Sequence, residues 1–208
     1  KAHFFIEFFT CFNGTLGIPH ISSSLHDLIK INLIGLNDDQ IYYQNLAIKG
    51  LSMILELFPS EITHLAANIQ RMFEISKNSL TMTEQDFKSI WNSIGDVINL
   101  DPSEIFSIYP LKDFLSITYD AANRTDIAAE SRIIPFLSFR QAFGYVDLED
   151  LPKFARISID ISKSYIQSTH NLPTDFIFFY DAVFNMFPHK PIYDFARTLG
   201  FELLQQSD

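Results

Sequence analysis

Carboxylates are the side chains of this sequence that lie close enough together to form a binding site. Six of them fall in two segments: Asp120, Asp126 and Glu130 around a turn at 120–131, and Asp147, Glu149 and Asp150 at a helix start. Carboxylates gathered on one surface attract cations, so the six are candidates for binding a basic peptide of a protein partner. Negative charge at a helix start also offsets the positive end of the helix dipole, and this simpler role accounts for 147–150 without any partner.

Residues typical of catalysis or metal binding are dispersed along the chain. The six histidines and the single cysteine lie in no His-Glu-x-x-His or Cys-x-x-Cys motif, and the sequence has no phosphate-binding glycine loop and no Gly-x-Ser-x-Gly. The acidic segment 37–40 lacks the glycine and the terminal glutamate of a calcium loop, so we interpret it as a helix cap. The sequence therefore predicts no enzyme, no metal ion and no cofactor.

Phenylalanine is unusually frequent, with 21 among 208 residues. The segment 175–187 is apolar around most of a helix, which is typical of a helix that is buried on both sides or lies in an interface. In the alternative interpretation, Phe176, Phe179, Val183 and Phe184 line an internal cavity for a lipid or another apolar ligand.

Charge and composition limit the class of protein. The formal net charge is −10 and the basic residues are scattered, whereas nucleic-acid binding needs a concentrated positive face. No uninterrupted apolar run reaches the ~20 residues that span a bilayer. Because Cys11 is the only cysteine, no internal disulfide can form, and this favours an intracellular location in the cytoplasm or nucleus. Since the chain begins with Lys1, we expect residues 1–208 to be one helical domain of a longer protein.

Hydrophobic periodicity predicts an all-α chain, because the 3.6-residue period recurs and no alternation typical of strands persists. Two helix starts are particularly clear. Thr83 to Asp86 has the layout of a capping box, and Asp101 precedes Pro102 at the first helical position. The predicted helices are 2–12, 25–36, 39–58, 60–76, 84–99, a short one from 101, 111–122, one from about 125 to 143, 150–168, 175–187 and 191–206.

Aromatic–proline steps separate several of these helices, at Phe58-Pro59, Tyr109-Pro110 and Phe187-Pro188. Proline lacks an N–H and disfavours helix at the preceding residue, so each step ends one helix and begins the path to the next. The steps predict stacked antiparallel hairpins, an α-solenoid of about 10–12 helices with degenerate HEAT-like repeats. The intervals of 51 and 78 residues are irregular and predict no regular sequence period.

Two segments carry a resemblance to a known family. The segment "QNLAIKGLSMILELFP" (44–59) resembles a HEAT or armadillo helix. Residues 154–204, with "FPHK" at 187–190 between two apolar segments, resemble part of a nuclear transport receptor of the importin-β/exportin superfamily. The chain lacks the regularly placed Asp and Arg pair of a standard HEAT repeat. The resemblance implies a solenoid that binds cargo proteins.

Two functions are therefore expected from the sequence. The first is a non-enzymatic scaffold or adaptor of helical repeats that binds protein partners, with cargo transport as its most specific form. The alternative is a compact helical bundle that holds a lipid or another apolar ligand in the phenylalanine-lined cavity.

Overall fold

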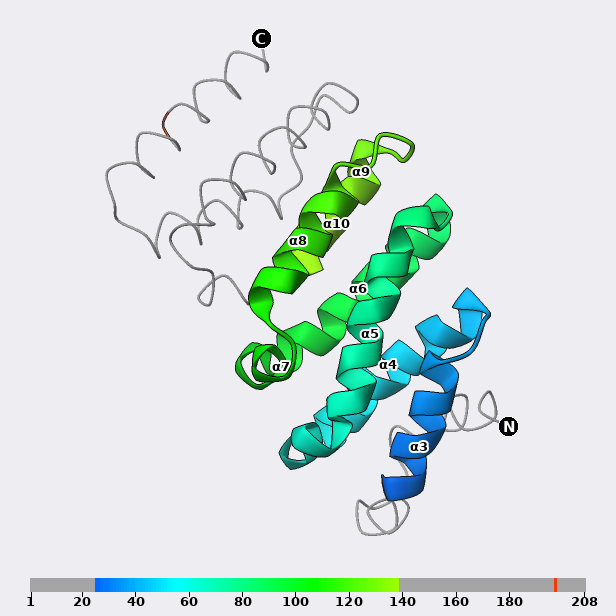
Figure 1. Cartoon of the computed structure of the whole chain (residues 1–208), viewed down its shortest axis with the longest axis vertical. Coiled ribbons are helices and arrows are strands. Elements are labelled where there is room, and N and C mark those ends of the chain that lie inside the picture. Colours follow the sequence, from blue (N-terminus) through cyan, green and yellow to red (C-terminus); the bar gives the residue numbers. More distant parts are fainter. Residues whose placement is uncertain (1–24, 139–196, 198–208) are drawn as a thin grey trace.

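The computed structural model describes residues 25–138 and residue 197, and within them every regular element is helical and none is a strand (Figure 1). The prediction of an all-α chain is confirmed for this part. The elements are α3 (Leu25–Leu36), α4 (Ile41–Leu57), the 3-10 helix η1 (Pro59–Leu65), α5 (Ala66–Asn78), the 3-10 helix η2 (Ser79–Thr81), α6 (Glu84–Leu100), α7 (Pro102–Ile108), α8 (Leu111–Ala122), α9 (Ala129–Arg132) and α10 (Ile134–Ser138).

Both of the clear helix starts are confirmed. Thr83 is the N-cap of α6, and its side-chain oxygen accepts a hydrogen bond from the backbone N–H of Asp86 at 3.3 Å. Asp101 is the N-cap of α7, where its carboxylate accepts from the N–H of Glu104 at 3.2 Å and Pro102 takes the first helical position. These caps satisfy backbone groups that have no partner inside the helix, and they are local, so the sequence alone predicts them.

Three predicted boundaries are wrong. The predicted helix 60–76 is divided, because η1 is a 3-10 turn and Leu65, with φ −94° and ψ 7°, separates it from α5. The helix expected from about 125 begins only at Ala129. The N-cap of α4 is Gln40, which has no side-chain cap, and Asp38 instead accepts from the N–H of Gln40 at 2.8 Å in the preceding turn.

The helices of the described part pack in two layers. In one layer α5 contacts α3 on one side and α8 on the other, and in the second layer α6 contacts both α4 and α10. The two layers are joined because α3 packs on α4, α5 on α6 and α8 on α10. Figure 1 shows α3, α5 and α8 following one another across the view in chain order. We call α3, α5 and α8 the first-helix layer, and α4, α6 and α10 the second-helix layer.

Two consecutive elements recur at one offset. Helix α4 begins at residue 41 and α6 at residue 84, each is 17 residues long, and the offset between them is 43 residues. The seven-residue elements η1 and α7 begin at Pro59 and Pro102, again 43 residues apart. The ends of the first helices follow at similar intervals, since α3, α5 and α8 end at residues 36, 78 and 122.

Buried positions repeat with the same offset. Ala47, Ile48 and Leu51 of α4 are fully buried, and so are the residues at the corresponding positions of α6, Ile90, Trp91 and Ile94. The sequence itself carries a trace of the repeat, because Leu-x-Pro-Ser-Glu-Ile occupies both 57–62 and 100–105. This part of the chain thus carries an internal offset of 43 residues that the spacing of the aromatic–proline steps did not predict.

The aromatic–proline steps did not indicate this period because they are not equivalent to one another. Phe58-Pro59 joins α4 to η1, whereas Tyr109-Pro110 joins α7 to α8. The 51 residues between these two steps therefore separate junctions of different kinds and do not measure the repeat length. The junction that corresponds to Pro59 is Pro102, which follows an aspartate. The third step, Phe187-Pro188, lies outside the described residues, as do the predicted helices 2–12, 150–168, 175–187 and 191–206 and the total of 10–12 helices.

Small residues allow a close approach within the second-helix layer. Ser52, Gly95 and Ser138 are buried and lie at successive offsets of 43 residues in α4, α6 and α10. A Cβ atom added to Gly95 would lie 2.9 Å from the Cα atom of Ser138, which is closer than real Cβ contacts. The hydroxyl of Ser138 also donates to the carbonyl oxygen of Trp91 at 2.7 Å. Glycine at residue 95 is therefore needed for α6 and α10 to pack at this distance.

Two nearly fully buried asparagines join three helices in the interior. The amide nitrogen of Asn32 donates to the carbonyl oxygen of Ala47 at 2.6 Å, which joins α3 to α4. The amide of Asn68 on α5 donates to the side-chain oxygen of Asn32 at 2.9 Å and to the carbonyl oxygen of Ile29 at 3.1 Å. Because buried polar groups are costly when unpaired, these bonds fix the register between neighbouring units.

Candidate functional site

The carboxyl-terminal ends of the first helices share one kind of contact. Each of three carbonyl groups at these ends accepts a hydrogen bond from an arginine of a later element: Leu36 from Arg71 at 3.2 Å, Ser79 from Arg124 at 3.0 Å and Ala122 from Arg132 at 2.6 Å. A cation near a helix carboxyl end is favourable because it meets the negative end of the helix dipole. Arg71 thus joins α5 to the end of α3, Arg124 joins the loop after α8 to the end of α5, and Arg132 joins α9 to the end of α8.

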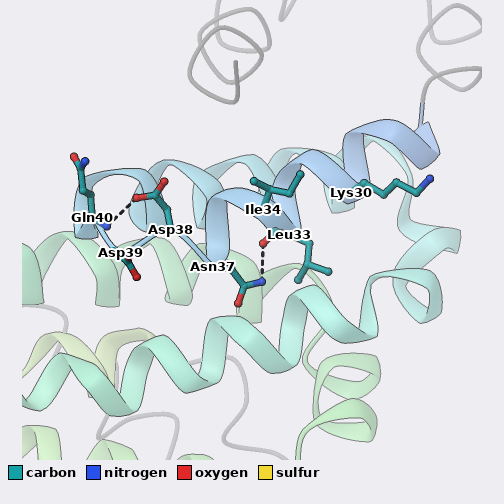
Figure 2. Close-up of a pocket in the computed structure, with 7 residues that line it drawn as sticks. All are labelled: Lys30, Leu33, Ile34, Asn37, Asp38, Asp39 and Gln40. Atoms are coloured by element: carbon teal, nitrogen blue, oxygen red, sulfur yellow. Dashed lines mark hydrogen bonds between the residues drawn. The ribbon is translucent and has the colours of Figure 1, made fainter.

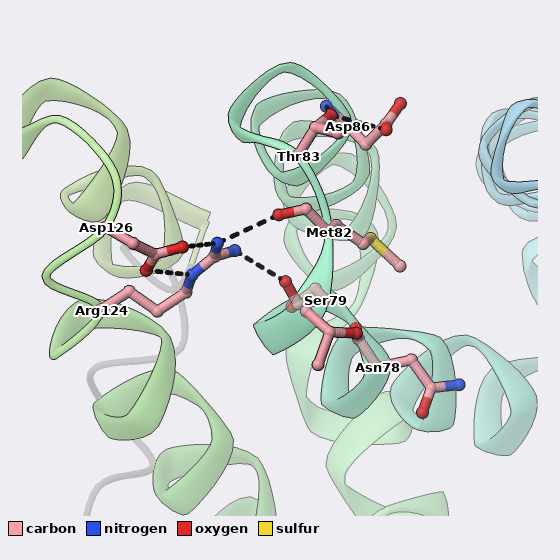
Figure 3. Close-up of polar contacts among 8 residues, drawn as sticks. Asn78, Ser79, Met82, Thr83, Asp86, Arg124 and Asp126 are labelled. Carbon is pink, nitrogen blue, oxygen red and sulfur yellow. Dashed lines mark hydrogen bonds and ion pairs between the residues drawn. The ribbon is translucent and has the colours of Figure 1, made fainter.

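Arg124 makes the most extensive of these contacts (Figure 3). Its guanidinium donates to the carbonyl oxygens of Ser79 and Met82, each at 3.0 Å, and its Nε atom donates to the carboxylate of Asp126 at 3.0 Å. The guanidinium carbon lies 5.4 Å from the centre of the Phe87 ring. Only 9% of the Arg124 side chain is exposed. Through its contacts with Ser79 and Met82, Arg124 joins the loop after α8 to the turn between α5 and α6.

The ion pair perturbs the pKa of both partners. Hydrogen bonding to the Arg124 guanidinium is the main cause that lowers the pKa of Asp126, and its positive charge lowers it further. The same hydrogen bonds raise the pKa of Arg124. Asp126 was a candidate for the acidic patch, and the structure places its carboxylate in a contact with this chain's own arginine.

A groove lies between α5 and α8 and contains another of the predicted residues, Asp120. Its volume is about 410 Å³. We name it the α5–α8 groove; its lining residues are Lys77, Leu80, Asp113, Ser116, Ile117 and Asp120. Asp113, Ile117 and Asp120 share one face of α8, because their spacings of four and three residues bring them above one another on a helix. The groove thus combines two exposed carboxylates with a partly apolar floor.

A second groove, of about 830 Å³, lies along α3 and the turn that follows it (Figure 2). We name it the α3 groove; it is lined by Lys30, Leu33, Ile34, Asn37, Asp38, Asp39 and Gln40. The side chain of Ile34 is 66% exposed, which is high for a large apolar residue. Lys30 lies at one end of this groove, and Asp38 and Asp39 lie at the other (Figure 2).

The two grooves share only part of the repeated unit, because the α3 groove is lined by α3 and its following turn, whereas the α5–α8 groove lies between two first helices. Ile34 in the α3 groove and Lys77 and Asp120 in the α5–α8 groove follow one another at offsets of 43 residues. Each groove also contains one lysine and two aspartates. The first-helix layer therefore carries two grooves, each of which contains lysine and aspartate side chains.

The remaining predicted residues are placed as follows. Glu130 lies in the first turn of α9, is partly buried and has an interaction partner of its own. The residues Asp147, Glu149 and Asp150, and the proposed cavity residues Phe176, Phe179, Val183 and Phe184, lie outside the described residues. The structure therefore brings one predicted carboxylate, Asp120, into a groove and ties another, Asp126, to Arg124.

Three residues of the site were not predicted from the sequence. Asp113 and Lys77 line the α5–α8 groove, and Arg124 fixes the neighbouring loop. The sequence offered one signal for the shared face, because Asp113 and Asp120 lie seven residues apart on a predicted helix. The contacts of Arg124 had no such signal, because they join residues 42 and 45 positions apart.

Further observations concern cofactors, membranes and relatives. Among residues 25–138, no three His, Cys, Asp or Glu side chains gather in a way that could hold a metal ion. No helix in the described part of the chain has both the length and the apolar character to cross a bilayer. No known family model, curated protein or solved structure matches this chain.

Proposed function

We propose that this chain is a segment of an α-solenoid that binds a protein partner along its first-helix layer and carries no catalytic site. The observation that supports the proposal is the offset of 43 residues between the starts of α4 and α6, between the starts of η1 and α7, and between buried positions of α4 and α6. HEAT and armadillo repeats have periods of about 40–47 residues. Stacked units of this kind form extended surfaces on which partners bind.

Cargo binding by an intracellular transport receptor of the importin-β/exportin type is the most specific form of this proposal. It rests on the resemblance of residues 44–59 and 154–204, and the repeat length is in keeping with it. The chain still departs from a standard HEAT repeat, which has a regularly placed Asp and Arg pair. In this chain the arginines at the helix ends contact backbone carbonyls and carboxylates that are close in sequence.

A site-specific photo-crosslinker tests the proposal. Placed in the full chain at residue 34, 77 or 120 on the first-helix layer, it should capture the same protein from cell extract at all three positions. Matched control positions are Lys49 and Asn92, which are exposed, lie 43 residues apart and belong to the second-helix layer. Capture that is equal at both layers, or absent from the first-helix layer, would contradict the proposed binding surface.

A further inference from the structure

The α5–α8 groove has an excess of negative charge that the described residues leave uncompensated. Asp113 and Asp120 are exposed, and neither carboxylate accepts a hydrogen bond or an ion pair from residues 25–138. The ammonium group of Lys77 instead lies 5.7 Å from the centre of the Tyr109 ring. Lys77 is therefore directed toward an aromatic ring, and both carboxylates are accessible to cations of a partner.

The geometry of the groove defines the spacing of those cations. Asp113 and Asp120 are seven residues apart on α8, which is two helical turns or about 10.5 Å. Between them lie Ser116, whose side chain is small, and Ile117, while Leu80 contributes a partly buried apolar side chain from the opposite wall. The groove thus has a carboxylate at each end, with the exposed Ser116 and the apolar side chains of Ile117 and Leu80 between them.

We propose that the α5–α8 groove binds a basic amphipathic helix of a partner protein, which names the partner class of the proposed scaffold and rests on that function. The helix carries Lys or Arg at positions i and i+7, opposite Asp120 and Asp113. It carries an apolar side chain at i+3 or i+4, which contacts Leu80 and Ile117. Recognition by one apolar helix face and its flanking charges is a common mode of peptide binding to helical grooves. The net charge of −10 also favours encounter with a basic partner.

The test is fluorescence anisotropy of two labelled helical peptides with the full chain. One peptide has lysines at i and i+7 with leucine at i+4, and the other has the same composition with its lysines moved to i and i+5. The first peptide should bind more tightly than the second. The variants Asp113→Asn and Asp120→Asn should each weaken binding about threefold, and the double variant about tenfold, as expected for exposed ion pairs.

Asp27→Asn is the matched control, because Asp27 is exposed on α3 at the position that corresponds to Asp113 two units later. This variant should leave the affinity unchanged, and circular dichroism should be the same for all variants. The inference is overturned if the two peptides bind equally, if the double variant binds as wild type does, or if neither peptide binds. A partner captured by crosslinking at residue 77 despite such a result would leave the scaffold function standing and reject only the basic helix.

Discussion

Arg124→Ala should be among the most destabilising substitutions of a polar residue in the described part of the chain. The variant removes two hydrogen bonds to the carbonyl oxygens of Ser79 and Met82, the ion pair with Asp126 and the contact with the Phe87 ring. These interactions join one repeated unit to the next, and only 9% of the side chain is exposed. Removing Arg124 should therefore loosen the junction between units.

The magnitude follows from the groups left behind. A hydrogen bond from a charged donor contributes about 1.5–3 kcal/mol, and the contact of a cation with an aromatic ring about 0.5–1 kcal/mol. Water can reach the two carbonyl groups once the side chain is removed, which recovers part of the loss. We expect Arg124→Ala to lower the free energy of unfolding by about 2–4 kcal/mol and Arg124→Lys by about 1–2 kcal/mol, because an ammonium cannot reproduce the planar fork.

Urea denaturation of the full chain measures these changes through the transition midpoint at constant slope. The matched control is Arg71→Ala, since Arg71 makes the corresponding contact with a single carbonyl, that of Leu36, and its side chain is 25% exposed. The control should cost about 1–1.5 kcal/mol, because Arg71 loses one backbone hydrogen bond and an exposed ion pair with Glu74 at a site that water already reaches. If Arg124→Ala costs no more than Arg71→Ala, the inferred role of Arg124 as the main link between units is refuted.

Two further predictions concern helix packing and pH. Gly95→Ala should lower the free energy of unfolding by about 1–2 kcal/mol. Alanine favours helix, but overpacking against the backbone of Ser138 outweighs that gain. Thermal denaturation measures the change, and a higher midpoint for the variant would contradict the close contact. Because the folded-state pKa of Asp126 is lowered, its stabilising contribution is present above the unfolded value near 3.9 and is lost as the pH falls through the folded value. Asp126→Asn should therefore be less stable than wild type at pH 7, and the difference should shrink below about pH 4; a difference that is independent of pH would show that the ion pair contributes nothing.

Local features of the fold could be predicted from the sequence because their causes lie within a few residues. The starts of α6 and α7 depend on Thr83 and Asp101, which bond to backbone groups three residues later. The repeat was missed because the residues at equivalent positions differ in chemistry. Corresponding places of α3, α5 and α8 hold Leu28, Arg71 and Phe114, so burial repeats there only in part. Identity repeats in one short segment, Leu-x-Pro-Ser-Glu-Ile at 57–62 and 100–105.

Only the part of the candidate site that depends on the spacing of charged residues along the sequence could be predicted. Asp120 was predicted because it lies near other carboxylates, but the opposite wall of the groove comes from α5 and η2, which the sequence does not place beside α8. Asp126 was assigned to the same patch because nothing in the sequence shows that Arg124 folds back onto the turn between α5 and α6. Contacts between units depend on tertiary packing and require the structure.

The central claim is that equivalent helices of the 43-residue units follow one another in a stack, so that α3 and α8 are second neighbours separated by α5. Electron paramagnetic resonance can measure this in the full chain with Cys11→Ser and spin labels attached to cysteines at residues 27 and 113, which are equivalent exposed positions of α3 and α8. Because packed helices lie about 8–10 Å apart, the stack predicts a label separation of about 16–20 Å, twice that between labels at residues 27 and 70. A separation of about 10 Å for both pairs would place α3 directly beside α8, as in a closed bundle, and would contradict the stack.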